Sequence, residues 1–319
     1  MTPATPEIPV DLCGIRLRNP VILASGVLGV SRDLIARVAA AGAGAAIIKS
    51  VSLEPREGHR NPTVIAYEAG MLNAVGYANQ GVEDAVREFE GVGDLPIPVF
   101  ASAVGQDADE FARVAERLMG CGFAGLEVPL SCPHTPGYGT LAGHGTPEAT
   151  ERIARAVRNT TDRPVFVKLS PNVPAIGDLA VAALEGGADG ISAVNTLGPG
   201  MVINVEARRP VLGFGVGGVS GPALRPVAVR CVFDVAVALR EVDLEVPIIG
   251  VGGVAAGRDA LEMIMAGASA VAVGTAVYQR GLGVFGTIAR ELADLCARLG
   301  IGSTAEVCGA ALRHHKEPV

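Results

Sequence analysis

The chain has 319 residues, so its length allows two domains of average size or one large one. Hydrophobic residues make up 49% and charged residues 18%, which excludes intrinsic disorder, and the lack of a glycine period or heptad run excludes collagen-like and coiled-coil proteins. The net charge of −7 and the absence of a basic run argue against nucleic-acid binding.

Eight short apolar runs alternate with longer, helix-like stretches along the chain. The runs are rich in Val, Ile and Ala, and most end in Gly or a small polar residue, which is typical of buried strands in a parallel sheet. They are VILAS (21–25), AAIIKS (45–50), PVFASAV (98–104), GLEVPLS (125–131), PVFVKLS (164–170), GISAVN (190–195), PIIGVGG (247–253) and AVAVGT (270–275).

The stretches between the runs carry helix signals. Ser31 and Asp107 stand at N-cap positions, and Thr146 is a cap followed by a proline and an acid in the first turn. We predict helices over residues 31–41, 107–119, 146–157, 179–184, 223–239, 258–265 and 277–299.

Eight alternations predict an α/β fold with a closed (β/α)8 TIM barrel, because parallel strands need crossover helices and eight strands close a barrel. An open doubly wound sheet is the alternative, but the glycine-rich fingerprint expected after its first strand is only weakly matched by ASGVLGVS. Residues 10–18 resemble an N-terminal β-hairpin that plugs the bottom of the barrel. No linker interrupts the chain, so we expect residues 1–319 to form one domain.

Three connections are too long for plain turns. They cover residues 51–79 after the second strand, 132–145 after the fourth and 197–220 after the sixth, and the last contains two β-like runs. All three insertions follow the carboxyl ends of strands, where barrel enzymes keep their active sites, so we expect them to form a substrate pocket or lid.

The lack of a recognisable signal peptide and the cysteine usage predict a cytoplasmic protein. The N-terminus lacks the basic start and apolar core of a signal peptide. The apolar uncharged stretch at residues 263–279 is shorter than the ~18 residues of a membrane helix, so no membrane association is expected. The six cysteines show no CxxC spacing, so we expect no disulfides, no zinc and no cysteine-ligated cluster.

Glycines at the last two strand ends predict a phosphate site. Gly252 and Gly253 end one strand, Gly274 and Thr275 end the next, and residues 217–221 add a third glycine-rich turn. Backbone N–H groups at such turns bind phosphate, and glycine permits its close approach. The alternative is that these glycines only make tight turns.

Lysines are scarce: only three of the 26 basic residues are Lys. Lys49 and Lys168 end strands at the expected barrel mouth, where a buried ammonium needs a negative partner. An anionic ligand is one candidate, and an internal ion pair with Glu127 is the alternative. Cys132 follows the fourth strand and suits a catalytic base or nucleophile, or else is an inert buried thiol. Asn73, Asn79, Asn172 and Asn195 also lie at strand or loop ends, which suits a small polar substrate.

The chain resembles the class 1 dihydroorotate dehydrogenases, FMN enzymes of de novo pyrimidine biosynthesis, and is most similar to the class 1B catalytic subunit. The resemblance runs in the family's order over nearly the whole chain. It rests on NPVILASG (19–26), IKS (48–50), NAVGYANQG (73–81), SCPH (131–134), VKLSPN (167–172), NT (195–196), GGVSGPALRPVAVR (217–230), IIGVGG (248–253) and AGASAVAVGT (266–275).

This resemblance implies a role for each matching residue. Cys132 is the implied base that removes the C5 proton of dihydroorotate while hydride passes from C6 to flavin N5. Lys168 is implied to stabilise the negative charge of reduced flavin beside N1 and C2=O. The implied FMN contacts are Ser25, Lys49, Ser50, Ser102, Lys168, Val194, Gly221, Gly252, Gly253, Gly274 and Thr275. The implied substrate contacts are Lys49, Asn73, Ala74, Val75, Gly76, Tyr77, His134, Asn195 and Thr196.

Three positions depart from the family's pattern. Pro129, His134 and Ser102 each stand where the family usually has Asn, and Pro129 brings neither a side-chain amide nor an N–H. Losing such a contact to a buried ligand costs roughly 1–3 kcal/mol unless it is replaced. The departures therefore bear on the identity of the substrate and leave the implied redox residues in place.

Three functions follow from these observations. The first is an FMN-dependent dihydroorotate dehydrogenase, a homodimer that passes electrons to NAD through a partner subunit carrying FAD and a 2Fe-2S cluster, since this chain has no cysteine motif for a cluster. The second is an FMN oxidoreductase acting on another dihydropyrimidine. The third is a non-redox phosphate-binding barrel, an isomerase or lyase that uses Lys168 as a Schiff-base or anion-binding residue.

Overall fold

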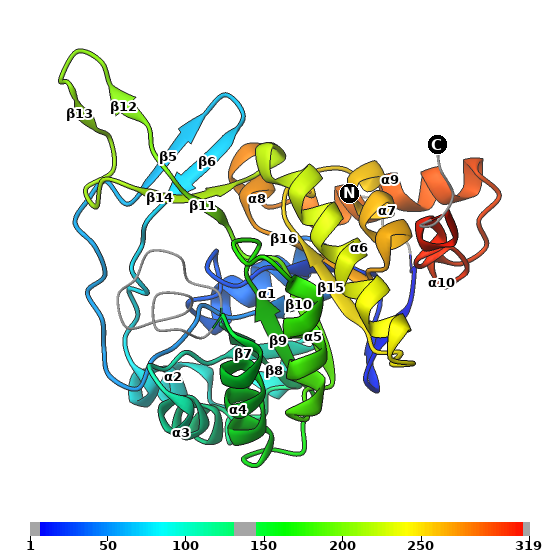
Figure 1. The fold of residues 1–319 in the computed structure, drawn as a ribbon, viewed down its shortest axis with the longest axis horizontal. Coiled ribbons are helices and arrows are strands. Elements are labelled where there is room, and N and C mark those ends of the chain that lie inside the picture. The colour runs from blue at the N-terminus through cyan, green and yellow to red at the C-terminus, as the bar shows by residue number, and fades with distance from the viewer. Residues whose placement is uncertain (1–6, 131–144, 315–319) are drawn as a thin grey trace.

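The computed structural model describes residues 7–130 and 145–314, and eight parallel strands in it close a barrel. All eight predicted strands are present, and the sequence prediction of a TIM barrel is confirmed (Figure 1). The pairing of β16 with β3 joins the last strand to the first and closes the circle. The barrel strands are β3 (Val21–Leu23), β4 (Ala45–Ile47), β7 (Val99–Ser102), β8 (Gly125–Pro129), β9 (Val165–Leu169), β10 (Gly190–Ala193), β15 (Ile248–Val251) and β16 (Ala270–Val273).

Helices surround the barrel and follow the predicted stretches with three differences. The segment expected to be one helix over residues 277–299 is broken, because Gly281 adopts a φ of 75° that ends the first part. The helices at Val82–Phe89 and Thr304–Val307 were not predicted. The helices are α1 (Arg32–Ala40), α2 (Val82–Phe89), α3 (Ala108–Met119), α4 (Pro147–Arg158), α5 (Ile176–Glu185), α6 (Arg225–Glu241), α7 (Gly257–Ala266), α8 (Thr275–Arg280), α9 (Val284–Arg298) and α10 (Thr304–Val307), with short 3-10 turns at Val92–Asp94, Pro222–Leu224 and Ala310–His314.

The predicted N-caps form in the structure. Ser31, Asp107 and Thr146 each accept a hydrogen bond through the side chain from a backbone N–H in the first turn, at 3.3, 2.9 and 3.3 Å respectively. Each of these helices follows the loop at the mouth end of a barrel strand. The caps therefore mark where the chain leaves the mouth and begins its return along the outside of the barrel.

The N-terminal hairpin closes the bottom of the barrel, as the sequence predicts. It consists of β1 (Val10–Leu12) and β2 (Ile15–Leu17), which pair antiparallel. Leu12 and Leu17 are fully buried and pack in one cluster with residues that fill the barrel interior. The Cys13 thiol donates to the carbonyl of Asp189, which precedes β10, so the hairpin lies at the amino ends of the strands.

Two of the long insertions build a second sheet above the mouth of the barrel (Figure 1). The strands from residues 51–79 and from residues 197–220 pair across it, since Ser220 lies opposite Met71 and Gly218 opposite Asn73. A separate two-stranded hairpin projects away from the barrel. The sheet has the order β11 (Leu197–Gly200), β14 (Gly217–Ser220), β6 (Gly70–Asn73) and β5 (Val64–Tyr67), and the hairpin is β12 (Ile203–Asn204) with β13 (Arg209–Pro210).

The third insertion, predicted over residues 132–145, lies almost wholly outside the described residues. Within the described ranges, no helix combines the length and the apolar character that crossing a bilayer requires.

The hairpin predicts a stability effect that is independent of any ligand. Leu12→Ala removes a side chain that is fully buried against the barrel interior, so we expect the free energy of unfolding to fall by about 2–5 kcal/mol. Arg16→Ala, on the exposed face of the same hairpin, is the control and should change stability by less than about 0.5 kcal/mol. Denaturant unfolding measures both variants. Equal midpoints for the two would show that the hairpin does not contribute to barrel stability.

Candidate functional site

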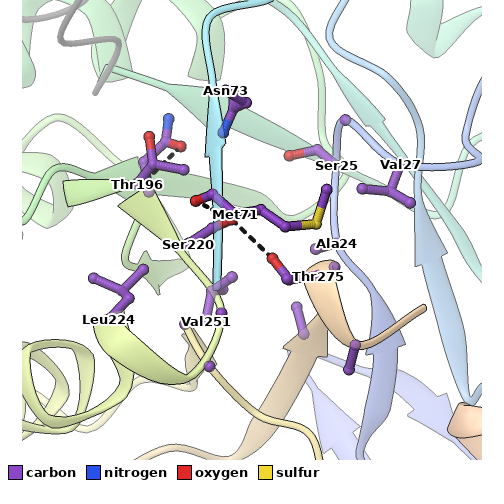
Figure 2. Close-up of a pocket in the computed structure, with 18 of the residues that line it drawn as sticks. Ala24, Ser25, Val27, Met71, Asn73, Thr196, Ser220, Leu224, Val251 and Thr275 are labelled. Atoms are coloured by element: carbon purple, nitrogen blue, oxygen red, sulfur yellow. Dashed lines mark hydrogen bonds between the residues drawn. The ribbon is translucent and has the colours of Figure 1, made fainter. Parts of the chain in front are cut away.

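A pocket of about 340 Å³ opens at the carboxyl ends of the barrel strands, beneath the second sheet. Strand ends from both halves of the barrel and residues of both insertions form its walls. Figure 2 shows Ser25 and Val27 across the pocket from Thr196 and Ser220. The sequence-predicted site residues that line it are Ser25, Lys49, Ser50, Asn73, Val75, Gly76, Tyr77, Lys168, Val194, Asn195, Thr196, Gly221, Gly252, Gly253, Gly274 and Thr275.

Of the predicted residues that the structure describes, Ala74 and Ser102 are not in this lining. Ala74 is fully buried with Leu72 and Leu212, because it points away from the pocket between Asn73 and Val75. Ser102 is fully buried and its hydroxyl lies 2.9 Å from that of Ser50, so it reaches the pocket only through its neighbour. Cys132 and His134 lie outside the described residues.

The glycine-rich turns form one corner of the pocket. Gly252, Gly253 and Gly221 have φ angles of 136°, 75° and 83°, which favour glycine. A Cβ on Gly253 would lie 2.6 Å from the Cβ of Arg225, so the backbone of β15 and the start of α6 approach closely. Thr275 donates a 2.8 Å hydrogen bond to Ser220, which draws the end of β16 to the same corner (Figure 2).

This corner combines glycine backbone with hydroxyl groups, and no Asp or Glu is among the described residues that line the pocket. Since the first N–H groups of a helix lack intrahelical acceptors, the turns that lead into the helices here suit an anion. The chemistry of the donors therefore fits a phosphate group, as the glycine pattern predicts.

Lys168 lies at the floor of the pocket and is 4% exposed. Its ammonium donates to the Ser25 hydroxyl at 3.0 Å and lies 3.4 Å from the Glu127 carboxylate. Ser25 in turn donates to the same carboxylate oxygen at 2.6 Å. The ion pair considered as the alternative for Lys168 is therefore present, and the lysine also faces the pocket.

Lys49 takes a different partner. Its ammonium lies 5.8 Å from the centre of the Tyr77 ring, which is within the range of a cation–π contact. Tyr77 and Gly76 belong to the loop after β6, so Lys49 at the end of β4 faces the insertion that covers it. The two lysines thus flank the pocket, one from its floor and one beneath its roof.

Asn172 holds the segment that follows β10. Its amide group donates to the Ser170 hydroxyl at 3.1 Å and to the carbonyl of Thr196 at 3.2 Å. Its oxygen accepts from the N–H of Gly198 at 2.9 Å. Asn195 and Thr196 line the pocket, so Asn172 fixes the wall that presents them.

The described cysteines do not line the pocket and remain thiols at neutral pH. Burial raises the pKa of Cys13 and of Cys231 to about 11, with nearby acids adding to the effect. Burial also raises the pKa of Cys121, Cys296 and Cys308. The raised pKa values disfavour the thiolate at neutral pH, so these cysteines are poor candidates for a general base.

Several lining residues were not predicted from the sequence. Met71 and Ser220 come from the second sheet, and Tyr278 comes from α8. Ser220 lies within the glycine-rich turn at residues 217–221, so the glycine pattern could have indicated it. No local signal marks Met71 or Tyr278, because their positions depend on how the insertions fold over the barrel. In the described part of the chain, no group of three His, Cys, Asp or Glu side chains is placed to hold a metal ion.

Comparison with known proteins places the chain in a family. The dihydroorotate dehydrogenase family model matches residues 7–296. The protein named dihydroorotate dehydrogenase B (NAD(+)), catalytic subunit, of Pyrococcus abyssi is 42% identical over 304 residues, covering 95% of this chain and 99% of its own. The protein of the same name from Desulforudis audaxviator is 45% identical over 306 residues, covering 95% and 97%.

A solved structure supports the fold. The crystal structure of the Eimeria tenella dihydroorotate dehydrogenase in complex with ferulenol superimposes with a TM-score of 0.82 at 24% identity, covering 97% of this chain and 89% of that one. Its low identity limits this likeness to the architecture. The family match and the full-length relatives above 40% identity show that the chain is an oxidoreductase of the dihydroorotate dehydrogenase family, most similar to the B-type catalytic subunits.

Proposed function

We propose that this chain is an FMN-dependent dihydroorotate dehydrogenase that oxidises (S)-dihydroorotate to orotate in de novo pyrimidine biosynthesis. The observation that carries the proposal is the pocket itself, which joins a glycine-rich anion corner to two lysines at the mouth of a barrel. The names of the full-length relatives support the same substrate. Membership in a family of oxidoreductases leaves the non-redox isomerase or lyase without support.

The residues present fit FMN. Gly221, Gly252 and Gly253 would hold its phosphate, with Gly274 and Thr275 from the next strand. Lys168 offers an ammonium from the floor, and Val251 and Ala272 add apolar surface for a flat ring. When bound, FMN supplies the hydride acceptor that amino-acid side chains lack.

The chain's own groups would bind the substrate and move the proton. Asn73 and Asn195 provide amide donors and acceptors for a flat ring that carries amide and carboxylate groups, and Lys49 provides a positive charge for the carboxylate. Cys132, three residues after the end of β8 in the sequence, would take the proton from C5. Lys168 would stabilise negative charge at the N1 and C2=O edge of the cofactor.

A partner subunit follows from the relatives' names, since a catalytic subunit implies another subunit. The proposed assembly is a homodimer of this chain together with a subunit that carries FAD and a 2Fe-2S cluster and passes electrons to NAD. We propose a cytoplasmic location, which the cysteine usage without a disulfide pattern supports.

A second substrate remains a candidate because of Pro129. This residue lines the pocket and lies beside Lys168 in the pairing of β8 with β9, yet it contributes no hydrogen-bond donor. A dihydropyrimidine with fewer polar groups than dihydroorotate would tolerate this loss better. The alternative activity is therefore an FMN oxidoreductase acting on such a compound, for example dihydrouracil.

Cofactor and substrate are tested together on the purified chain saturated with FMN. We expect a visible flavin absorbance that stays with the protein on gel filtration and bleaches on anaerobic addition of dihydroorotate. Dihydrouracil is the matched substrate and should bleach it at least tenfold more slowly. A protein that retains no flavin contradicts the cofactor proposal, whereas faster bleaching by dihydrouracil favours the second substrate.

The base is tested by replacing Cys132. We expect Cys132→Ser to slow flavin reduction by dihydroorotate by about 10²–10⁴-fold at neutral pH, because a serine hydroxyl is a far weaker base than a thiolate. FMN content should change little. Cys308→Ser, whose thiol contacts the carbonyls of Gly267 and Ala268 away from the pocket, is the control and should react like the parent. Stopped-flow absorbance measures the rates, and equal rates for Cys132→Ser and parent would exclude this base.

The wall held by Asn172 gives a further test. Asn172→Ala removes the acceptor of the Gly198 N–H, so amide exchange at residues 195–198 should become roughly two- to tenfold faster. The KM for dihydroorotate should rise more than kcat falls, because the wall presents binding groups. Asn159→Ala at the exposed end of α4 serves as the control. Unchanged exchange at residues 195–198 would mean that Asn172 does not hold this wall.

A further inference from the structure

The layer of side chains beneath the pocket is divided into a polar half and an apolar half. Phe100 and Phe166 fill the interior, so Ser102 and Lys168, two residues further along their strands, face inward as well. The strand register places Glu127 beside Ser102, and Ser192 beside Lys168. The inward residues of the other four strands are apolar: Ala24, Ile47, Val251 and Ala272.

Glu127 is the acidic residue of this polar half, and it is 1% exposed. One of its oxygens, Oε1, accepts the hydrogen bond of Ser25 at 2.6 Å and lies 3.4 Å from the ammonium of Lys168. The Ser25 oxygen also accepts from Lys168 at 3.0 Å, so the three groups form a closed triangle. The triangle joins β8, β9 and Ser25, two residues after the end of β3, across the barrel interior.

A buried carboxylate and a buried ammonium are each costly alone and stable together. Glu127 does not line the pocket, whereas Ser25 and Lys168 do. The carboxylate therefore acts on any ligand through these two neighbours. Its place below them fixes where the ammonium lies and balances its charge.

We propose that Glu127 is a positioning residue, a fixed counter-charge that holds Lys168 at the floor of the pocket so that the cofactor meets a net-neutral ion pair instead of a lone cation. The effect on the cofactor rests on the proposed function, whereas the ion pair does not. Ser25 belongs to the same triangle of groups, since its hydroxyl links the Glu127 carboxylate to the Lys168 ammonium.

Glu127→Gln separates charge from shape. Oε2 of Glu127 has no hydrogen-bond partner among the described residues, so an amide NH2 at that position replaces no acceptor in use. The amide oxygen keeps the place of Oε1, where the ammonium and the Ser25 hydroxyl both require an acceptor. The variant thus keeps the observed hydrogen bonds and removes one negative charge.

The first experiment uses the FMN-free protein and a double-mutant cycle of thermal unfolding. Glu127→Gln and Lys168→Met each leave one buried charge without its partner, so each should lower Tm. The double variant should recover more than half of the summed losses, because both charges are then gone. If the Tm of the double variant falls by the sum of the two single losses, Glu127 and Lys168 are not coupled and the proposed ion pair is rejected. If a single variant fails to fold, folding of the double variant supports the pair, and failure of the double variant as well contradicts it.

The second experiment measures the midpoint potential of bound FMN in parent, Glu127→Gln and Glu116→Gln. Glu116 is exposed on α3, so its variant removes the same charge far from the pocket. We expect a more positive potential for Glu127→Gln, since the ammonium then acts on reduced flavin without its counter-charge, and no shift for Glu116→Gln. Glu127→Asp, which keeps the charge, should return most of the shift. An unchanged or more negative potential in Glu127→Gln overturns the proposed action on the cofactor.

The two experiments fail independently of each other. A chain that binds no FMN contradicts the proposed function, while the FMN-free cycle still decides whether Glu127 and Lys168 are coupled. An intact coupling with an unmoved potential would leave Glu127 as a structural partner only, which is the outcome that rejects the positioning role.

Discussion

Closure of a parallel barrel sends the carboxyl end of every strand to one face, and the site depends on this constraint. The pairing of β16 with β3 brings the last and first barrel strands together, so that Thr275 and Ser25 face one pocket. Ser25 then reaches Lys168 and Glu127 from the far side of the interior. An open sheet with the same strand order would place Ser25 at one edge and Thr275 at the other, with Glu127 and Lys168 on the middle strands.

The barrel was predictable because its signals are local. An apolar run with small residues at its end is a buried parallel strand whatever its neighbours do, and side-chain caps such as Asp107 act within one turn. The predicted helix over residues 277–299 was wrong for a related reason. Its apolar spacing continues through Gly281, and only the positive φ of that residue breaks the helix. The helix at Val82–Phe89 was missed in the sequence, where it directly follows the long insertion at residues 51–79.

The sequence predicts which residues of the candidate site lie at strand ends. It predicts much less well which partners their side chains contact. Position alone brings Lys49, Lys168 and the glycines to the mouth of the barrel. Which partner Lys168 takes is a matter of side-chain reach across the interior, so the sequence left Glu127 and an anionic ligand as alternatives. Ala74 shows a second limit, since its four motif neighbours line the pocket while Ala74 itself packs against Leu72 and Leu212, and the motif alone does not show this difference.

The second sheet above the mouth of the barrel has a consequence for how the substrate preference of such a pocket can evolve. Its β6 comes from one insertion and its β14 from another, and each supplies the hydrogen-bonding edge that the other needs. Met71 and Ser220 therefore belong to a single roof although almost half the chain separates them. A loop grafted from a relative would arrive without its partner edge, so new substrate preferences in this architecture must be exchanged as matched pairs of loops.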